Sequence, residues 1–148
     1  VIRVEILGNL NNFQSNVTRT GVLGRATEEQ RRIWAVLMEA RARALERLHP
    51  GTAVRDLWEA YAGHCRKHAI EPTLAFLGHG IGLTGHEEPY LTGDKTLLLE
   101  AGMVVTFEPF YMLPPRMGFQ IEDMFLVTDA AYETLTAVTT NETLIEVG

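Results

Sequence analysis

Residues 78–87 read GHGIGLTGHE and follow directly on the apolar segment 74–77, so alternating glycines frame His79 where a strand would end. Glycine adopts positive φ angles at little cost and lets another group approach the backbone closely. The pattern therefore suits a His79 side chain that points into a binding site from a tight strand exit. The alternative is a glycine-rich turn with incidental histidines, and segments further along the chain must decide between the two.

Two glutamates stand inside apolar, strand-like segments that follow. Glu108 lies within MVVTFEP (103–109), and Glu122 lies within QIEDMFLV (120–127). Burying a carboxylate in a strand is costly unless it is paired, protonated or bound to a cation. A single such glutamate is explained by an edge position or a salt bridge, but two on adjoining strands favour convergence with His79 on a metal ion. This ligand set suits Zn, Mn, Co or Fe.

Apolar spacing predicts two helices between two groups of strands. One helix begins after Thr27, which forms a capping box with Gln30, and runs to about residue 48; the second follows the cap Thr52 and fades near residue 69. Turns are expected at 8–12 and 129–131. Stretches rich in β-branched and aromatic residues predict strands at 1–7, 13–22, 74–77, 103–110, 119–128 and 132–136. We expect an α+β fold, ordered β-β-α-α-β-β-β-β, with two helices packed on a curved, mostly antiparallel sheet.

Bulk composition excludes several classes of protein. The 148 residues are 46% hydrophobic and 22% charged, which is typical of a globular domain or a piece of one. No apolar run is long enough for a membrane helix, and a net charge of −6 without a basic stripe argues against nucleic acid. Cys65 is the only cysteine, so we expect a reducing, cytoplasmic setting and a buried structural thiol rather than a nucleophile.

Four segments together resemble the second half of the pita-bread metallopeptidase family, which includes methionine aminopeptidase, aminopeptidase P, prolidase and the non-peptidase creatinase. They are SNVTRTGVLGRATEEQ (15–30), GHGIGLTGHEEP (78–89), LLEAGMVVTFEP (98–109) and IEDMFLVTDAAYETLT (121–136). The resemblance implies that residues 1–148 form the C-terminal portion of a pita-bread catalytic domain. Because the sequence opens at Val1, already within a strand-like stretch, we expect the N-terminal half of that domain to lie outside this chain.

The resemblance also implies roles for individual residues. His79, Glu108 and Glu122 would bind metal, and Glu108 would also serve as the general base. His79 and His86 would face the substrate, with His86 bonded to its carbonyl oxygen. The two aspartate ligands of the family fall on Glu5 and Asn16.

Three positions depart from the family pattern. Glu5 keeps the charge of an aspartate but is one methylene longer, whereas Asn16 offers only a neutral oxygen in place of a bridging carboxylate. Gln120 stands where many relatives carry an arginine, so a charge partner of the neighbouring carboxylate is expected to be lost. The cofactor expectation is therefore a divalent ion (Mn, Co, Zn or Fe), as one ion, two ions or none.

Three functions remain open on these residues. The first is a metal-dependent hydrolase of short peptides of the Xaa-Pro dipeptidase or aminopeptidase type, acting as a homodimer. The second is a creatinase-like hydrolase that cleaves a C–N bond of a small amide-like substrate without metal. The third is a non-catalytic module that binds peptides. Outside this set, His64 and His68 share a helix face at i, i+4, which is either a solvated surface or an adventitious metal site.

Overall fold

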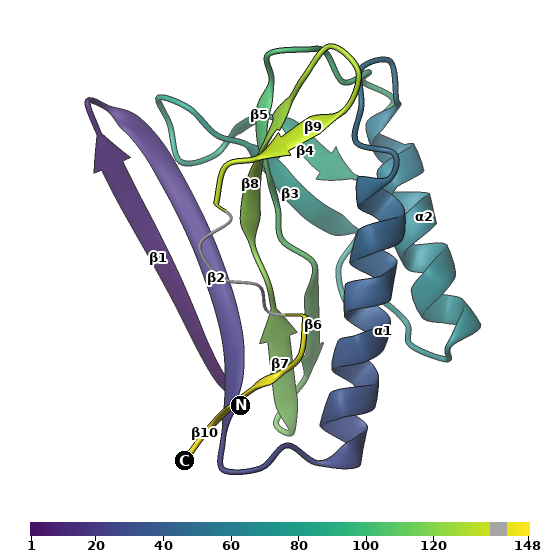
Figure 1. Ribbon diagram of the computed structural model, residues 1–148. Helices are drawn as coiled ribbons and strands as arrows, with labels where there is room; N and C mark the ends of the chain where they lie inside the picture. Colours follow the sequence, from purple (N-terminus) through teal and green to yellow (C-terminus); the bar gives the residue numbers. More distant parts are fainter. Residues whose placement is uncertain (137–141) are drawn as a thin grey trace.

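The computed structural model describes residues 1–136 and 142–148, and it has the expected α+β architecture with helices on one side of antiparallel sheets (Figure 1). The helices are α1 (Glu28–Leu45) and α2 (Val54–Lys67). The strands in chain order are β1 (Ile2–Leu10), β2 (Phe13–Leu23), β3 (Phe76–Gly80), β4 (Glu87–Thr92), β5 (Val104–Phe107), β6 (Phe110–Leu113), β7 (Met117–Gln120), β8 (Asp123–Val127), β9 (Tyr132–Thr134) and β10 (Ile145–Val147).

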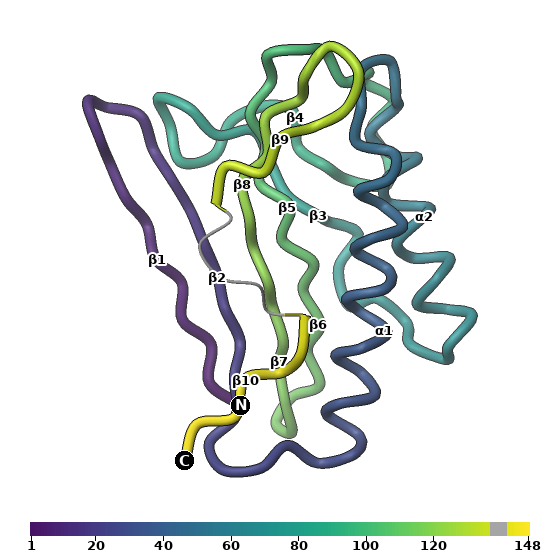
Figure 2. Tube along the Cα trace, in the orientation of Figure 1, coloured from purple at the N-terminus to yellow at the C-terminus, as the bar shows by residue number. Residues whose placement is uncertain are grey.

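The first two strands form the predicted hairpin. They pair antiparallel from Ile2 opposite Gly21 to Leu10 opposite Phe13. The turn consists of Asn11 and Asn12, whose φ angles of 52° and 71° are those of a type I′ turn, and asparagine tolerates this left-handed region better than most residues. In both views the hairpin projects away from the helices (Figures 1 and 2), and β10 adds to β2 in parallel near the chain termini.

The two helices begin differently, and the sequence predicts the cap of α1 but not that of α2. Thr27 and Gln30 form the expected capping box at α1. The expectation that Thr52 caps α2 is wrong, because the N-cap is Ala53 and no side-chain cap hydrogen bond forms there among the described residues. The Thr52 hydroxyl instead lies 3.1 Å from Nδ1 of His49, and the N–H groups of Val54 and Arg55 bond the carbonyls of Leu97 and Lys95.

The central sheet has the strand order β4-β3-β5-β8-β9, and β6 pairs with β7 as a separate hairpin. The predicted strands at 103–110 and 119–128 are each interrupted, at Glu108 and at Glu122. At both breaks the backbone N–H leaves the ladder to bond another segment, from Glu108 to the Leu77 carbonyl at 2.6 Å and from Glu122 to the Thr18 carbonyl at 3.0 Å. The strand predicted at 74–77 is shifted to β3. The sequence does not predict β4, because EEPYLT lacks the apolar alternation of a strand.

The hydrophobic core lies between the helices and the sheets. Trp34 on α1 packs against Phe119 on β7 with ring centroids 5.9 Å apart, and Leu37 and Leu57 are buried on the inward faces of the two helices. Cys65 is also fully buried, as predicted for a structural thiol, and burial raises the pKa of its thiol to about 11. Neither helix is long and apolar enough to cross a membrane.

Candidate metal centre

Three segments of the central sheet bring His79, Glu108 and Glu122 together. His79 lies on β3, Glu108 follows β5 directly, and Glu122 precedes β8 directly. Because β5 and β8 pair with Phe107 opposite Asp123, the two glutamates emerge from facing ends of adjacent strands. The exposed fractions are 0% for His79, 0% for Glu122 and 9% for Glu108, so the cluster is buried.

The three side chains are spaced as a ligand set. One ligand atom from each lies within 4.8 Å of the others. Nε2 of His79 is 3.2 Å from Oε1 of Glu108 and 3.9 Å from Oε1 of Glu122. These separations are close to those between donor atoms that share one divalent ion with bonds of about 2.0–2.2 Å.

Two glycines allow β3 to reach this position. A Cβ atom on Gly78 would collide with the Thr106 carbonyl, and one on Gly80 would collide with the Glu88 carbonyl. Gly78 also has a φ of 152°, which side chains disfavour. Close backbone approach on both flanks of His79 is therefore the structural reason for the glycine pattern.

Hydrogen bonding settles which nitrogen of His79 faces the carboxylates. Nδ1 lies 2.8 Å from the Gly80 carbonyl, which can only accept, so Nδ1 carries the proton. In the neutral ring Nε2 then presents a lone pair to Glu108 and Glu122. Nε2 and Oε1 of Glu122 are both buried and have no hydrogen-bond partner among the described residues. Buried acceptors that face one another are unfavourable unless a proton or a cation lies between them, so the site fits a metal ion.

The pKa values of Glu122 and His79 are both raised, which is consistent with negative charge crowded into the buried cluster. Burial and the neighbouring Glu108 raise the pKa of Glu122 to about 7, although the Thr18 hydroxyl partly offsets the rise. Burial lowers the pKa of His79, but the Glu108 carboxylate and the Gly80 carbonyl outweigh burial and raise it overall. Without a cation, Glu122 and His79 therefore keep their protons to higher pH than the same groups in water.

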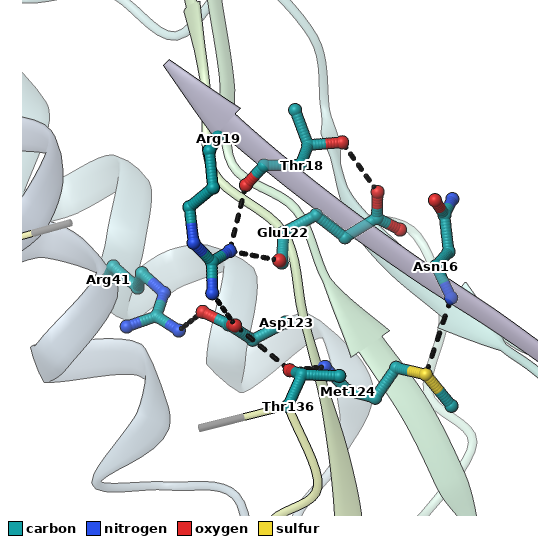
Figure 3. A network of polar contacts seen from close by, with 8 residues as sticks. All are labelled: Asn16, Thr18, Arg19, Arg41, Glu122, Asp123, Met124 and Thr136. Carbon is teal, nitrogen blue, oxygen red and sulfur yellow. Dashed lines mark hydrogen bonds and ion pairs between the residues drawn. The ribbon is translucent and has the colours of Figure 1, made fainter. Parts of the chain in front are cut away.

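A buried ion-pair network fixes the strand that carries Glu122. Asp123 points to the opposite side of the chain from Glu122 and bonds Arg19 and Arg41, each at 2.6 Å (Figure 3). Arg19 also donates to the Glu122 carbonyl at 2.7 Å. The Thr18 hydroxyl donates to Oε2 of Glu122 at 2.9 Å, which leaves Oε1 for a cation. Sequence reasoning assigned no role to these support residues, although Thr18 and Arg19 lie in the TRT segment and Asp123 adjoins Glu122.

Glu5 and Asn16 lie beside this cluster but differ in burial. Glu5 pairs with Thr18 across the β1–β2 hairpin, so Asn16, two residues away on β2, shares its face. The Asn16 amide nitrogen donates to Oε1 of Glu5 at 3.3 Å, and Oδ1 of Asn16 is buried without a hydrogen-bond partner in the described ranges. Glu5 is exposed. The hairpin thus supplies one neutral buried oxygen and one peripheral carboxylate.

Gln120 is a neutral hydrogen-bond partner of Glu108, and a cation lies on its far side. Its amide nitrogen donates to Oε2 of Glu108 at 2.8 Å, and its Oε1 accepts from Arg3 at 2.8 Å. Arg3 lies 117 residues away in the chain, so no local signal predicts this contact. The Arg3 guanidinium thus bonds Gln120 rather than Glu108, and the two bonds fix the orientation of the amide.

His86 lies over the buried histidine. The His79 and His86 rings are stacked with centroids 3.7 Å apart and an interplanar angle of 19°. His86 is exposed, whereas His79 is not. An exposed imidazole directly above the cluster is placed to contact a molecule that enters from solvent.

The comparisons with known proteins agree with this geometry. Residues 1–129 match the model of metallopeptidase family M24. A Xaa-Pro dipeptidase from Pyrococcus furiosus is 35% identical over 127 residues, which cover 85% of this chain and 36% of that relative. The chain therefore spans little more than a third of the length of this relative.

Solved structures match over nearly the whole chain and confirm the pita-bread fold. The dipeptidase PepE from Mycobacterium ulcerans has a TM-score of 0.92 and 29% identity, covering 98% of this chain and 39% of that one. The prolidase from Pyrococcus furiosus has a TM-score of 0.89 and 32% identity, covering 93% and 41%. The fold, the buried cluster and the match over residues 1–129 lead to one conclusion: this chain belongs to metallopeptidase family M24.

Proposed function

We propose that this chain carries the metal-binding half of a hydrolase that cleaves short peptides, with Xaa-Pro dipeptides as the substrate class. The observation that supports it most directly is the convergence of His79, Glu108 and Glu122 with unpartnered buried atoms facing one another. The substrate class rests on the similarity to a Xaa-Pro dipeptidase and a prolidase.

We infer that one divalent ion is held tightly, by Nε2 of His79 and the carboxylates of Glu108 and Glu122. The buried Oδ1 of Asn16 can add a fourth, neutral oxygen. Two ions at close range need bridging anions to offset their repulsion, and Asn16 cannot supply one. A second ion would depend on the exposed Glu5 and bind weakly. The mixed nitrogen and oxygen donors suit Mn²⁺, Co²⁺, Zn²⁺ or Fe²⁺.

A bound ion would supply Lewis-acid activation of the water nucleophile and of the scissile carbonyl. Glu108 is placed to accept the proton from the attacking water and to return it to the leaving amine. It is the only member of the trio with solvent exposure, and the Gln120 amide holds its second oxygen. His86, exposed above His79, is placed to hydrogen-bond the substrate carbonyl and the oxyanion that develops there.

The test is metal analysis together with hydrolysis of Gly-Pro by the purified full-length protein, stripped with EDTA and reloaded with Mn²⁺ or Co²⁺. We expect about one ion per chain and turnover that requires it. His79→Ala should lose both, whereas His49→Ala, which removes an exposed histidine in the loop after α1, should keep both. Absence of bound metal and of turnover in the wild-type protein would overturn the proposal.

Two alternatives appear as distinct results of the same experiment. Asn16 favours a module that binds peptides without cutting them, since a neutral residue replaces a charged ligand of the family pattern. That function predicts saturable peptide binding with no product. A creatinase-like reaction predicts activity on small amide-like compounds that survives EDTA. A homodimeric assembly and a cytoplasmic location also stay predictions, to be tested by analytical ultracentrifugation and cell fractionation.

A further inference from the structure

A second group of metal-ligating side chains lies on the helical side of the molecule, away from the His79 cluster. Glu39 projects from α1, His64 from α2, and His68 is the C-cap residue of α2. One ligand atom from each lies within 4.8 Å of the others. The two imidazole rings have centroids 4.7 Å apart, and Nε2 of His64 is 3.2 Å from Oε2 of Glu39.

His64 is the anchor of this group. Its side chain is only 15% exposed, so this part of the α2 face is not the solvated surface that the sequence allowed. Nε2 of His64 is buried and makes no hydrogen bond of ordinary geometry within the described residues, although the Glu39 carboxylate is close. A buried nitrogen aimed at an adjacent carboxylate and a second imidazole is the arrangement of atoms around a cation rather than of a solvated face.

We propose that Glu39, His64 and His68 form a second metal site that takes an imidazole-preferring divalent ion of the Zn²⁺ type and joins α1 to α2. Two histidines and one carboxylate are a common zinc set, with a water molecule completing the tetrahedron. Histidines at i, i+4 lie on one helix face, which is the spacing that two ligands from a single helix require.

The present separations need only small movements to reach coordination. Ligand atoms around a tetrahedral zinc ion with bonds of about 2.0–2.1 Å lie about 3.3 Å apart. The contact between His64 and Glu39 already meets this spacing, at 3.2 Å. The widest separation, at most 4.8 Å, closes by rotation of Glu39 and His68, which are both exposed and free to change rotamer.

The local charge makes this site selective for metals that bond strongly to imidazole. A groove of about 390 Å³ beside His64 contains three basic and two acidic side chains, a net charge of +1 from 3 − 2; these are Arg43, Arg47, Lys67, Glu46 and Glu59. Glu39 offsets this charge, so the groove and the site together are neutral and add no net electrostatic attraction for a cation. Ions such as Mg²⁺ and Ca²⁺, which depend on charge and oxygen ligands, should therefore bind poorly, while Zn²⁺ and Cu²⁺ should bind through their nitrogen bonds.

The experiment counts Zn²⁺ by isothermal titration calorimetry on EDTA-stripped protein at about pH 7.5, with parallel melting curves. The variants are His68→Gln and Glu39→Gln, both exposed, so that the fold is retained, as circular dichroism will verify. His49→Gln is the matched control, because it removes an exposed histidine that belongs to no group of metal-ligating side chains among the described residues. Cu²⁺ electron paramagnetic resonance supplies the ligand identity.

We expect the wild-type protein to bind one Zn²⁺ more than His68→Gln, and affinity at this site to fall at least about tenfold in Glu39→Gln. Binding of Zn²⁺ at this site should raise the melting temperature of the wild-type protein, and this contribution should be absent in His68→Gln. In the electron paramagnetic resonance spectrum, Cu²⁺ bound at this site should show hyperfine coupling to two imidazole nitrogens. In His68→Gln it should show coupling to one. Equal Zn²⁺ counts in wild type and His68→Gln would overturn the proposal, and so would the same loss in His49→Gln, since binding would then be generic to surface histidines.

Discussion

Replacing Glu122 with glutamine should stabilise the metal-free protein while weakening its metal site. Burial and Glu108 raise the pKa of Glu122 from its ordinary 4.5 to about 7, so the folded state binds more protons than the unfolded state between these values. Stability is therefore lost as pH rises from 4.5 to 7, and the full cost is present above 7. At about 1.4 kcal/mol per pKa unit, the ionised carboxylate costs the metal-free fold about 3 kcal/mol near pH 8 and about 1 kcal/mol near pH 5.

The glutamine variant removes this cost without creating a cavity. The Thr18 hydroxyl can donate to the amide oxygen as it now donates to Oε2. The new amide group takes the place of Oε1, 3.9 Å from Nε2 of His79, and can offer a proton to a nitrogen that has no donor among the described residues. We expect Glu122→Gln to be more stable than wild type by about 3 kcal/mol near pH 8, with the difference shrinking toward pH 5.

Urea unfolding in EDTA, at several pH values between 5 and 8, measures this difference. Glu133→Gln on β9 makes the same chemical change at an exposed position and should follow the wild-type curve. Titration with Mn²⁺ then tests the other half of the prediction, because the variant should lose metal affinity as it gains stability. Equal stability of Glu122→Gln and wild type near pH 8, or a lower stability of the variant, would refute the reasoning.

Three further predictions concern the surroundings of the site. Asn16→Asp should raise the metal content from one ion to two per chain in atomic absorption measurements, because a bridging anion then lies beside Glu122. Asp123→Asn should destabilise the protein by about 3 kcal/mol in urea unfolding, because it leaves two largely buried guanidinium groups, Arg19 and Arg41, without their anion. The Cys65 thiol, whose pKa burial raises to about 11, should react with a thiol reagent at pH 8 only at the rate of unfolding.

Each of these three predictions has an outcome that would contradict it. A metal content that stays at one ion in Asn16→Asp would mean that the neutral oxygen is not what limits the second site. Asp123→Asn should cost far more than Glu71→Gln, which breaks an exposed pair with Arg66, and similar values for the two variants would contradict the importance of burial. Rapid, denaturant-independent labelling of Cys65 would show that the thiol is accessible.

The parts of the fold and site that the sequence predicts are those with local signals. The Thr27–Gln30 capping box and the hairpin turn expected within 8–12 each depend on a few adjacent residues. Both are present, although β1 extends to Leu10 and the turn is confined to Asn11 and Asn12. The carboxylates at 108 and 122 are recognisable in the sequence because burying a charged residue in an apolar strand is costly unless the charge is paired, protonated or bound to a cation. Their grouping with His79 is present in the structure, and their role as metal ligands stays a prediction.

The parts that it does not predict depend on contacts between distant segments. The strand breaks at Glu108 and Glu122 arise because their N–H groups bond other segments, which periodicity cannot reveal. The link from Arg3 through Gln120 spans most of the chain. The proximity of Glu39 to His64 likewise exists only because α1 and α2 pack side by side.

Crystals of the protein grown with Mn²⁺, and anomalous difference maps calculated from them, would test most directly whether the buried trio binds a metal. We expect one strong peak at about 2.0–2.2 Å from Nε2 of His79 and from a carboxylate oxygen of Glu108 and of Glu122. No peak there at saturating Mn²⁺, or a peak that touches none of the three side chains, would contradict the assignment of this cluster as the metal centre.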